Sequence, residues 1–262
     1  MNQQMQSSQS SPGDAATAAS VVIRPCATPE EFRACVEVET EVWNFDASEA
    51  VSHHIMAVAH ETGGQVFGAF DGQRMIGFAL AFPAIRDGHV HLHSHMAAVI
   101  SAYQERGIGQ MLKLKQREEA LSRGIKLIEW TFDPLQTRNA NFNIRRLGAV
   151  VRRYLPNFYG VSSSPLHSNL PTDRLVAAWH LDSGRVRAHI AGKAHEPGDN
   201  QRKISVPKNM NELRHADPSK AAEIQLGVRR QCQDAFEQQY TVTAFTTDEN
   251  NGYFILEKNY AY

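Results

Sequence analysis

The 262-residue sequence lacks a cysteine framework, a long apolar run and an excess of charge of one sign. Its three cysteines, Cys26, Cys35 and Cys232, are far apart and odd in number, so they predict neither disulfides nor a metal-binding spacing. We therefore expect a reducing, cytoplasmic location with buried cysteines. No apolar run approaches the ~20 residues of a membrane helix. A net charge of −1 gives no reason to expect nucleic acid as a partner.

Composition also divides the chain. Residues 1–20 are rich in Gln, Ser and Ala and have neither the basic start nor the apolar segment of a secretory signal. We expect them to form a disordered tail. A core domain is expected over residues 21–182. Residues 183–262 are expected to form a C-terminal α+β extension that packs on the core or provides a homodimer contact.

Hydrophobic periodicity and turn signals predict an antiparallel start followed by alternating strands and helices. Pro29 suits a first helical turn, Asp71-Gly72 is a strong hairpin signal and Gly124 is typical of a helix end. This order predicts an α/β fold with a mixed sheet and helices on its faces. The expected strands are 21–25, the two arms of a hairpin over 65–82, 89–100, 126–132, 149–155, 174–181, 240–246 and 252–258. The expected helices are 28–43, 51–60, 107–123, 139–147 and 218–239.

A glycine loop follows one predicted strand and opens a predicted helix. Unpaired amides at a helix N-terminus, together with the helix dipole, favour a bound anion such as phosphate. A Walker loop is excluded because no Gly-Lys-Ser/Thr is present, and Leu112 replaces the third glycine of a dinucleotide fingerprint. The segment Gln104-Glu105-Arg106-Gly107-Ile108-Gly109 instead fits the pyrophosphate loop of acyl-CoA transferases, Q/R-x-x-G-x-G/A. A tight turn without a ligand is the alternative.

Beyond this loop, several segments resemble the GNAT superfamily of N-acetyltransferases. HMAAVISAYQERGIGQML is similar to that family's fourth strand, loop and third helix, and LIEWTF to its fifth strand. RNANFNIRRLGAV is similar to its next helix and ends in the turn Leu147-Gly148-Ala149. The resemblance runs from about Val21 to Leu155. EWTFDPLQTRNANFN, RRYLPNFYG and LPTDRLVAAW further resemble a bacterial branch of predicted acetyltransferases with an extra C-terminal region. The implied architecture is a GNAT-like acyltransferase fold with a C-terminal extension.

The resemblance implies acetyl-CoA or another acyl-CoA as co-substrate. The amides that would hold the CoA pyrophosphate are those of Arg106, Gly107, Ile108, Gly109 and Gln110. Gln104 would bind the phosphates or shape the loop, and the backbone near Ala97 and Val99 would pair with the pantetheine arm. Asn139 and Asn143, one helical turn apart, would reach CoA from one face or serve only as capping and solvated residues. The tyrosine that often acts as general acid in the family falls at Ile144, and neither Tyr154 nor Tyr159 aligns with it.

A histidine-rich strand supplies the candidate bases. His89, His91, His93 and His95 alternate, so a strand would place all four imidazoles on one face. Four histidines in a row cannot all bind one ion, and no second ligand cluster accompanies them, so we expect no metal. A base that titrates near neutral pH would deprotonate an amine. His93, where histone-modifying members of the family have a glutamate, is the first candidate, followed by His95 and Glu129; core or groove-lining roles are the alternative for each.

These features predict an acyl-CoA-dependent N-acyltransferase, with acetyl-CoA as the favoured donor. The acceptor is expected to be a primary amine of a small molecule or an amino acid, without nucleic acid or membrane partners. The absence of cysteine from the motif region favours direct attack over an acyl-enzyme. Loops at 44–60 and 157–173 are expected to select the acceptor. A non-catalytic acyl-CoA-binding module, favoured by the missing tyrosine, and a metal-dependent hydrolase built on the histidine strand are the alternatives.

Overall fold

The structure is a computed structural model that describes residues 21–43, 50–160, 170–198 and 201–261. The disordered tail predicted for residues 1–20 lies outside the described residues. So do residues 44–49 and 161–169, which belong to the two loops expected to select an acceptor.

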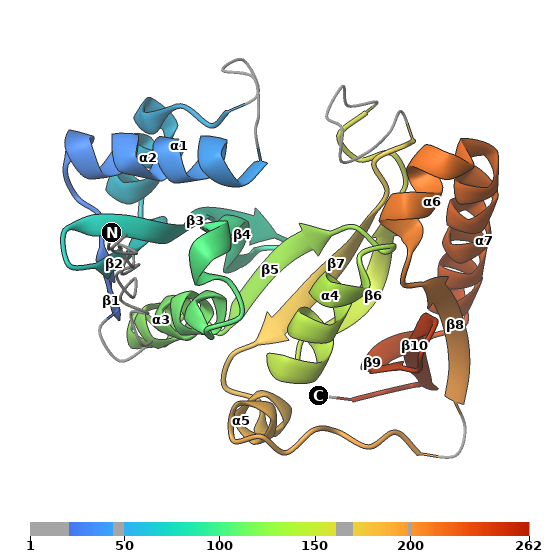
Figure 1. The fold of residues 1–262 in the computed structure, drawn as a ribbon. Helices are drawn as coiled ribbons and strands as arrows, with labels where there is room; N and C mark the ends of the chain where they lie inside the picture. The colour runs from blue at the N-terminus through green and yellow to red at the C-terminus, as the bar shows by residue number, and fades with distance from the viewer. Residues whose placement is uncertain (1–20, 44–49, 161–169, 199–200, 262) are drawn as a thin grey trace, which may run out of the picture.

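The described strands form one mixed sheet (Figure 1), which confirms the predicted fold class. Their order across the sheet is β1-β2-β3-β4-β5-β7-β6-β9-β10-β8. β4 and β5 pair in parallel, whereas the other neighbouring strands pair antiparallel. The strands are β1 Val21–Pro25, β2 Gln65–Asp71, β3 Arg74–Arg86, β4 His89–Val99, β5 Leu127–Phe132, β6 Val150–Leu155, β7 Arg174–His180, β8 Gln201–Pro207, β9 Tyr240–Thr247 and β10 Asn251–Lys258.

Helices cover both faces of the N-terminal half of the sheet. Figure 1 shows α1 and α2 above β2–β4 and α3 below them, with α6 and α7 at the opposite end of the molecule. The helices are α1 Pro29–Trp43, α2 His53–Glu61, α3 Ile108–Ser122, α4 Thr137–Ala140, α5 Gly184–Ile190, α6 Met210–Ala216 and α7 Pro218–Glu237; a 3₁₀ turn, η2, spans Ser101–Tyr103 and a π-helical segment, η3, spans Asn141–Arg146.

Two hydrophobic clusters form the core. The N-terminal cluster joins α1 and α2 to β2–β4 and includes Phe78, Leu80 and Leu112. The second cluster extends from β4 and β5 to β9 and β10 and includes Trp179 and Ala120. Because Leu112 and Ala120 both belong to α3, this helix passes from one cluster to the other beneath β2–β4.

The C-terminal region continues the sheet. β9 pairs with β6 at Val242↔Val151, and β10 and β8 follow outward. The division of the chain at residue 182 therefore stays a prediction. The sequence did not predict α5, β8 or α6, nor the insertion of β7 between β5 and β6.

Candidate active site

The parallel pair β4 and β5 forms a fork. The two strands pair at two positions, the second being His93↔Glu129, and then separate. β4 runs on to Val99 and pairs with β3 along its other edge. From Ser94 to Val99, no described strand lies beside the edge that faces β5, so an extended ligand can pair with it like an added strand. The predicted pantetheine-binding backbone at Ala97 and Val99 lies on this edge. We call the His93–Glu129 pair the apex of the fork.

The glycine loop lies between β4 and α3, and Gly107 is the N-cap of α3. Its φ of 83° is in the left-handed region that favours glycine. A Cβ built at Gly107 or Gly109 would meet nothing within 4 Å, so open space lies beside the first turn of α3. The amides of that turn, including the predicted ones of Ile108 and Gln110, lie at the positive end of the helix dipole.

Gln104 and Arg106 take specific places in this loop. The Nε2 of Gln104 donates to the backbone oxygen of Val99 at 3.0 Å, so this side chain ties the loop to the end of β4. The guanidinium of Arg106 lies 5.0 Å from the ring centre of Tyr103 and is exposed. Of the two roles proposed for Gln104, this geometry favours shaping the loop.

The two predicted asparagines differ in environment. Asn139 is exposed in α4, whereas Asn143 is buried in the π-helical segment η3. The prediction that both asparagines share one face depends on α-helical spacing. That spacing ends at Ala140, where the π-helical segment begins, so it no longer places Asn143 on the face of Asn139. Arg138, beside Asn139, makes a 3.5 Å ion pair with Glu105, which brings α4 next to the glycine loop. Ile144 is fully buried.

The four histidines of β4 are not equivalent. His89 and His95 are exposed, His91 is 2% exposed and His93 is partly buried. A register shift pairs Ser94 with Ala81 and Met96 with Leu80, so His95 is an extra residue opposite β3. The ring centres of His93 and His95 lie 6.3 Å apart. Among the described residues, no group of three His, Cys, Asp or Glu side chains is placed to hold a metal ion.

His93 is a neutral imidazole at physiological pH. Burial and, to a smaller extent, the neighbouring His95 lower its pKa to about 4, while the carboxylate of Glu129 acts in the opposite direction. A neutral imidazole next to the fork is able to accept a proton, although a lowered pKa also makes it a weaker base.

Glu129 is surrounded by cations. Its carboxylate pairs with Arg86 from β3, lies 3.7 Å from Arg153 of β6 and lies 3.6 Å from Nε2 of the buried His91. The residue is 7% exposed. Glu129 therefore serves as the counter-ion of this cluster, and the geometry favours His93 over Glu129 as a base.

The two tyrosines considered as general acids also have defined contacts. Tyr154 is buried and donates to Asp173 at 2.6 Å; burial and this carboxylate raise the pKa of Tyr154. Asp173 also pairs with Arg229 of α7 at 2.7 Å, so Tyr154 belongs to a contact between β6 and α7. Tyr159 is exposed, and its hydroxyl lies 3.0 Å from Oγ1 of Thr131 at the end of β5.

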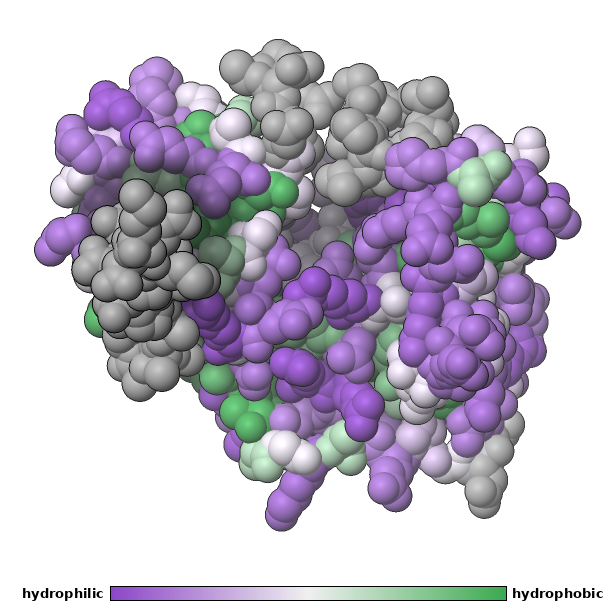
Figure 2. All heavy atoms as spheres, in the orientation of Figure 1, coloured by the Kyte–Doolittle hydropathy of each residue, from purple (hydrophilic) through white to green (hydrophobic). Residues whose placement is uncertain are grey.

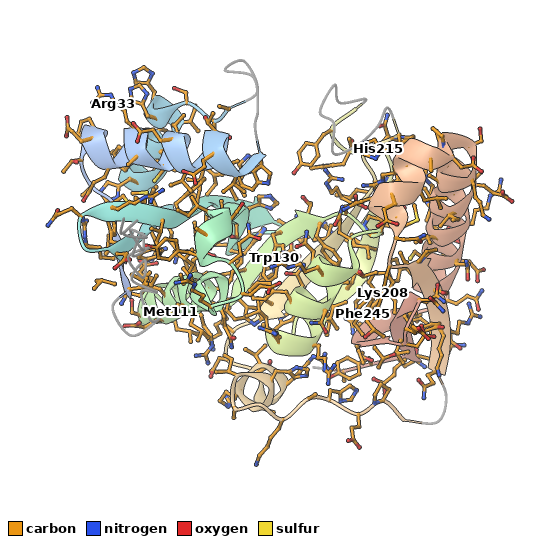
Figure 3. The ribbon with its side chains drawn as sticks, viewed as in Figure 1. Arg33, Met111, Trp130, Lys208, His215 and Phe245 are labelled. Carbon is orange, nitrogen blue, oxygen red and sulfur yellow. The ribbon has the colours of Figure 1, made fainter. Side chains whose placement is uncertain are left out.

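Sequence reasoning missed one charged residue near the apex, Lys113 of α3. Its Nζ donates to Oγ of Ser94 at 2.7 Å and lies 4.0 Å from the ring centre of Trp130. Figure 3 shows Trp130 at the centre of the molecule, between α3, which carries Met111, and the C-terminal part. A lysine within an amphipathic helix pattern is ordinarily exposed, so only the packing of α3 under the fork reveals its burial.

The surface is hollowed between the part that carries α1 and α2, where hydrophobic residues border the hollow, and the part that carries α6 and α7, where hydrophilic residues border it (Figure 2). A strand fork, an open glycine loop at a helix N-terminus and a neutral histidine thus lie in one region.

Residues 28–149 match the model of the acetyltransferase (GNAT) family. This part of the chain belongs to the GNAT family. It is an acetyltransferase domain, with acyl-CoA as its co-substrate, and the chain continues from residue 150 to residue 262 beyond the match.

Solved structures share the fold of this GNAT domain. A protein from Desulfovibrio desulfuricans assigned to the GNAT family is 17% identical, with a TM-score of 0.51; the alignment covers 62% of this chain and 99% of that one. The ribosomal-protein-S18-alanine N-acetyltransferase of Escherichia coli is 17% identical, with a TM-score of 0.50 and coverage of 63% and 96%. The yncA protein of Salmonella typhimurium, solved with its cofactor acetyl-CoA, is 18% identical, with a TM-score of 0.50 and coverage of 69% and 99%. No curated protein matches this chain.

The described helices are too short or too polar to cross a membrane.

Proposed function

We propose that this GNAT domain transfers an acetyl group from acetyl-CoA to a primary amine of a small molecule or an amino acid. The observation that carries the proposal is the fork, because β4 continues to Val99 after its pairing with β5 ends at His93↔Glu129. The free edge of β4 leads from the glycine loop to the apex. It offers hydrogen bonds to an extended, amide-containing arm such as pantetheine.

The glycine loop supports the placement of the CoA pyrophosphate. Open space lies beside Gly107 and Gly109, where any larger side chain would occupy the volume next to the first-turn amides. The amides of Arg106 through Gly109 hold the phosphates, whereas the predicted amide of Gln110 already donates to the backbone oxygen of Gly107 at 3.0 Å. Gln104 keeps the loop against Val99. Asn139 and Asn143 are assigned weaker roles. The ion pair between Arg138 and Glu105 brings α4 next to the glycine loop, so the exposed Asn139 of α4 is assigned the position nearer to the ligand.

His93 is the proposed base, and His95 the second candidate. The amine attacks the thioester carbonyl directly, and the neutral imidazole of His93 takes the proton that the attacking nitrogen loses. The three cysteines are buried, and none of them lies on β4 or β5, the strands of the fork, which supports direct attack over an acyl-enzyme.

Gly109 provides the test, because it has space for a side chain and, unlike Gly107, no positive φ. We expect Gly109→Leu to weaken CoA binding at least ~10-fold by filling the phosphate volume, with an unchanged melting temperature. Gly109→Ala is the matched control and should bind CoA. Equal CoA affinity of wild type and Gly109→Leu in calorimetric titration would refute the loop assignment.

A second measurement separates turnover from binding. The full chain is incubated with acetyl-CoA and a pool of alkylamines and amino acids, and release of free thiol is followed. Amine-dependent thiol release supports the enzyme, whereas CoA binding without release supports a non-catalytic module. Thiol release that stops on addition of a chelator would instead support metal-dependent hydrolysis.

A further inference from the structure

Lys113 is a buried cation without an anionic partner among the described residues. The residue is 4% exposed, and no described carboxylate lies within ion-pair distance of its Nζ. Its polar contact is the hydroxyl of Ser94, which in turn donates to Oε1 of Gln116 at 3.1 Å. Lysine is almost never fully buried unless it is paired. Burial is the cause that lowers its pKa, from 10.5 to about 7.

The position of Lys113 relative to the fork is specific. The last residues to pair across β4 and β5 are His93 and Glu129. Ser94 and Trp130 are the next residues on the two strands, and the Nζ of Lys113 contacts both. Lys113 therefore caps the apex from the face of the sheet that carries α3.

Other titratable groups surround the apex. His93 of β4 carries the nearest imidazole, and the charge of Lys113 helps to lower the pKa of His93. Glu129 of β5 is held by its own cations. On α3, Glu119 pairs with Arg123 at 2.7 Å and accepts a hydrogen bond from Gln65 of β2. None of these carboxylates neutralises Lys113.

We propose that Lys113 is a further catalytic residue of the acyl transfer, the group that protonates the departing CoA sulfur at the apex of the fork. The proposal rests on the function proposed above. A CoA arm that pairs with β4 from Val99 back to Ser94 covers roughly 17 Å of extended strand and ends beside the Nζ of Lys113.

The amine nitrogen forms a bond to the thioester carbonyl carbon, and His93 takes the proton released from that nitrogen. When the tetrahedral intermediate collapses, the C–S bond breaks and its electron pair stays on sulfur. An N–H bond of the Lys113 ammonium then breaks, and the proton forms the S–H bond of CoA. Lys113 is left neutral and regains a proton from water, while His93 gives its proton to water.

The lowered pKa matches this task. A thiol has a pKa of about 8.5, and an ordinary lysine one of about 10.4, so an ordinary lysine is a weaker acid than the thiol it would have to protonate. With a pKa of about 7, Lys113 is a stronger acid than the thiol and still partly protonated at neutral pH. The neutral amine that remains also suits the buried site.

The test titrates the CoA thiol in its complex with the full chain, by the ultraviolet absorbance of the thiolate. Lys113 is largely deprotonated above about pH 7, so the comparison is made at about pH 6, where its ammonium is present and stabilises the thiolate. There we expect bound CoA to have about ten times the thiolate fraction of free CoA, and in Lys113→Met this excess should disappear. Lys115→Met, a matched change on the same helix at a half-buried position that pairs with Glu118, should behave as wild type.

Desulfo-CoA, which lacks the sulfur, tests whether Lys113→Met leaves the rest of the CoA site intact, because loss of a merely structural lysine would weaken its binding. It should bind wild type and Lys113→Met with affinities equal within about twofold, because the phosphate and β4 contacts are intact. With acetyl-CoA and the amine pool, Lys113→Met should lower kcat by ~10²–10⁴-fold with little change in KM for acetyl-CoA. Wild-type kcat should fall as pH rises above about 7, and this limb should vanish in the variant.

The outcomes separate the two proposals. Equal thiolate fractions of CoA bound to wild type and to Lys113→Met at about pH 6 would overturn the role of Lys113 and leave the acyltransferase intact. A wild-type chain that does not bind CoA would overturn both.

Discussion

Replacement of Lys113 by methionine should stabilise the fold near neutral pH. A fall in the lysine pKa from 10.5 to about 7 corresponds to a cost of at most about 5 kcal/mol for the protonated folded state. Methionine has a similar shape and leaves no charge to desolvate beside Trp130. The lost hydrogen bond to Ser94 offsets about 1.5–3 kcal/mol of the gain. We expect a net increase of about 2 kcal/mol in the free energy of unfolding at neutral pH.

The sign of the pH dependence follows from proton binding. Between pH 7 and 10.5 the unfolded chain holds a proton on Lys113 that the folded chain has lost, so wild-type stability rises with pH across this window. Below about pH 7 both states are protonated and the full cost remains. The advantage of Lys113→Met over wild type should therefore be largest at or below about pH 7 and shrink toward pH 10.

Urea unfolding at about pH 7 and about pH 10 measures both quantities, provided that the dependence on denaturant has the same slope in each protein. Lys115→Met, at the half-buried position that pairs with Glu118, is the control for a Lys→Met change on α3 and should show no such pH dependence. A variant less stable than wild type at pH 7, or a stability difference that does not change with pH, would show that Lys113 is a structural residue rather than one held at a cost in stability.

Three further predictions concern the loop, the base and the ion cluster. Gly107→Ala should destabilise the fold by roughly 1 kcal/mol because its φ is 83°, whereas Gly109→Ala should not, as thermal unfolding will show. His93→Ala should lower kcat by ~10²–10⁴-fold on an amine of high pKa, and the wild-type rate should be independent of His93 ionisation above about pH 5, because a base with a pKa of about 4 is already neutral there. Arg86→Gln should cost about 1 kcal/mol in urea unfolding, because Glu129 keeps a second guanidinium partner; a loss of several kcal/mol would show that Arg86 alone neutralises this carboxylate.

Local signals predicted most of the elements. Asp71-Gly72 placed the β2–β3 turn, and the glycine loop placed the start of α3, because turn chemistry and helix N-termini depend on neighbouring residues. Alternation predicted β4, but it did not reveal the register shift at His95. A β-bulge adds one residue to a strand, so positions counted before and after it no longer share one face.

Non-local pairing explains what the sequence did not reveal. β7 lies between β5 and β6 although it follows both in the chain, and its place there sets Arg153 of β6 within reach of Glu129. The burial of Lys113 likewise depends on the passage of α3 beneath the fork, which no periodicity in residues 108–122 encodes. Such contacts join residues that are distant in sequence, whereas propensity and periodicity describe one segment at a time.

The fork also explains why a base and an acid can act on one thioester without neutralising each other. His93 and Ser94 are consecutive on β4, so their side chains point to opposite faces of the sheet. Ser94 accepts the hydrogen bond of Lys113 from the α3 face, while His93 lies opposite Glu129 on the other face. In the proposed reaction the proton of the attacking amine leaves toward one face and the proton for the sulfur arrives from the other. Alternation of two neighbouring residues at the point where the strands separate is therefore sufficient to keep the proposed donor and acceptor apart.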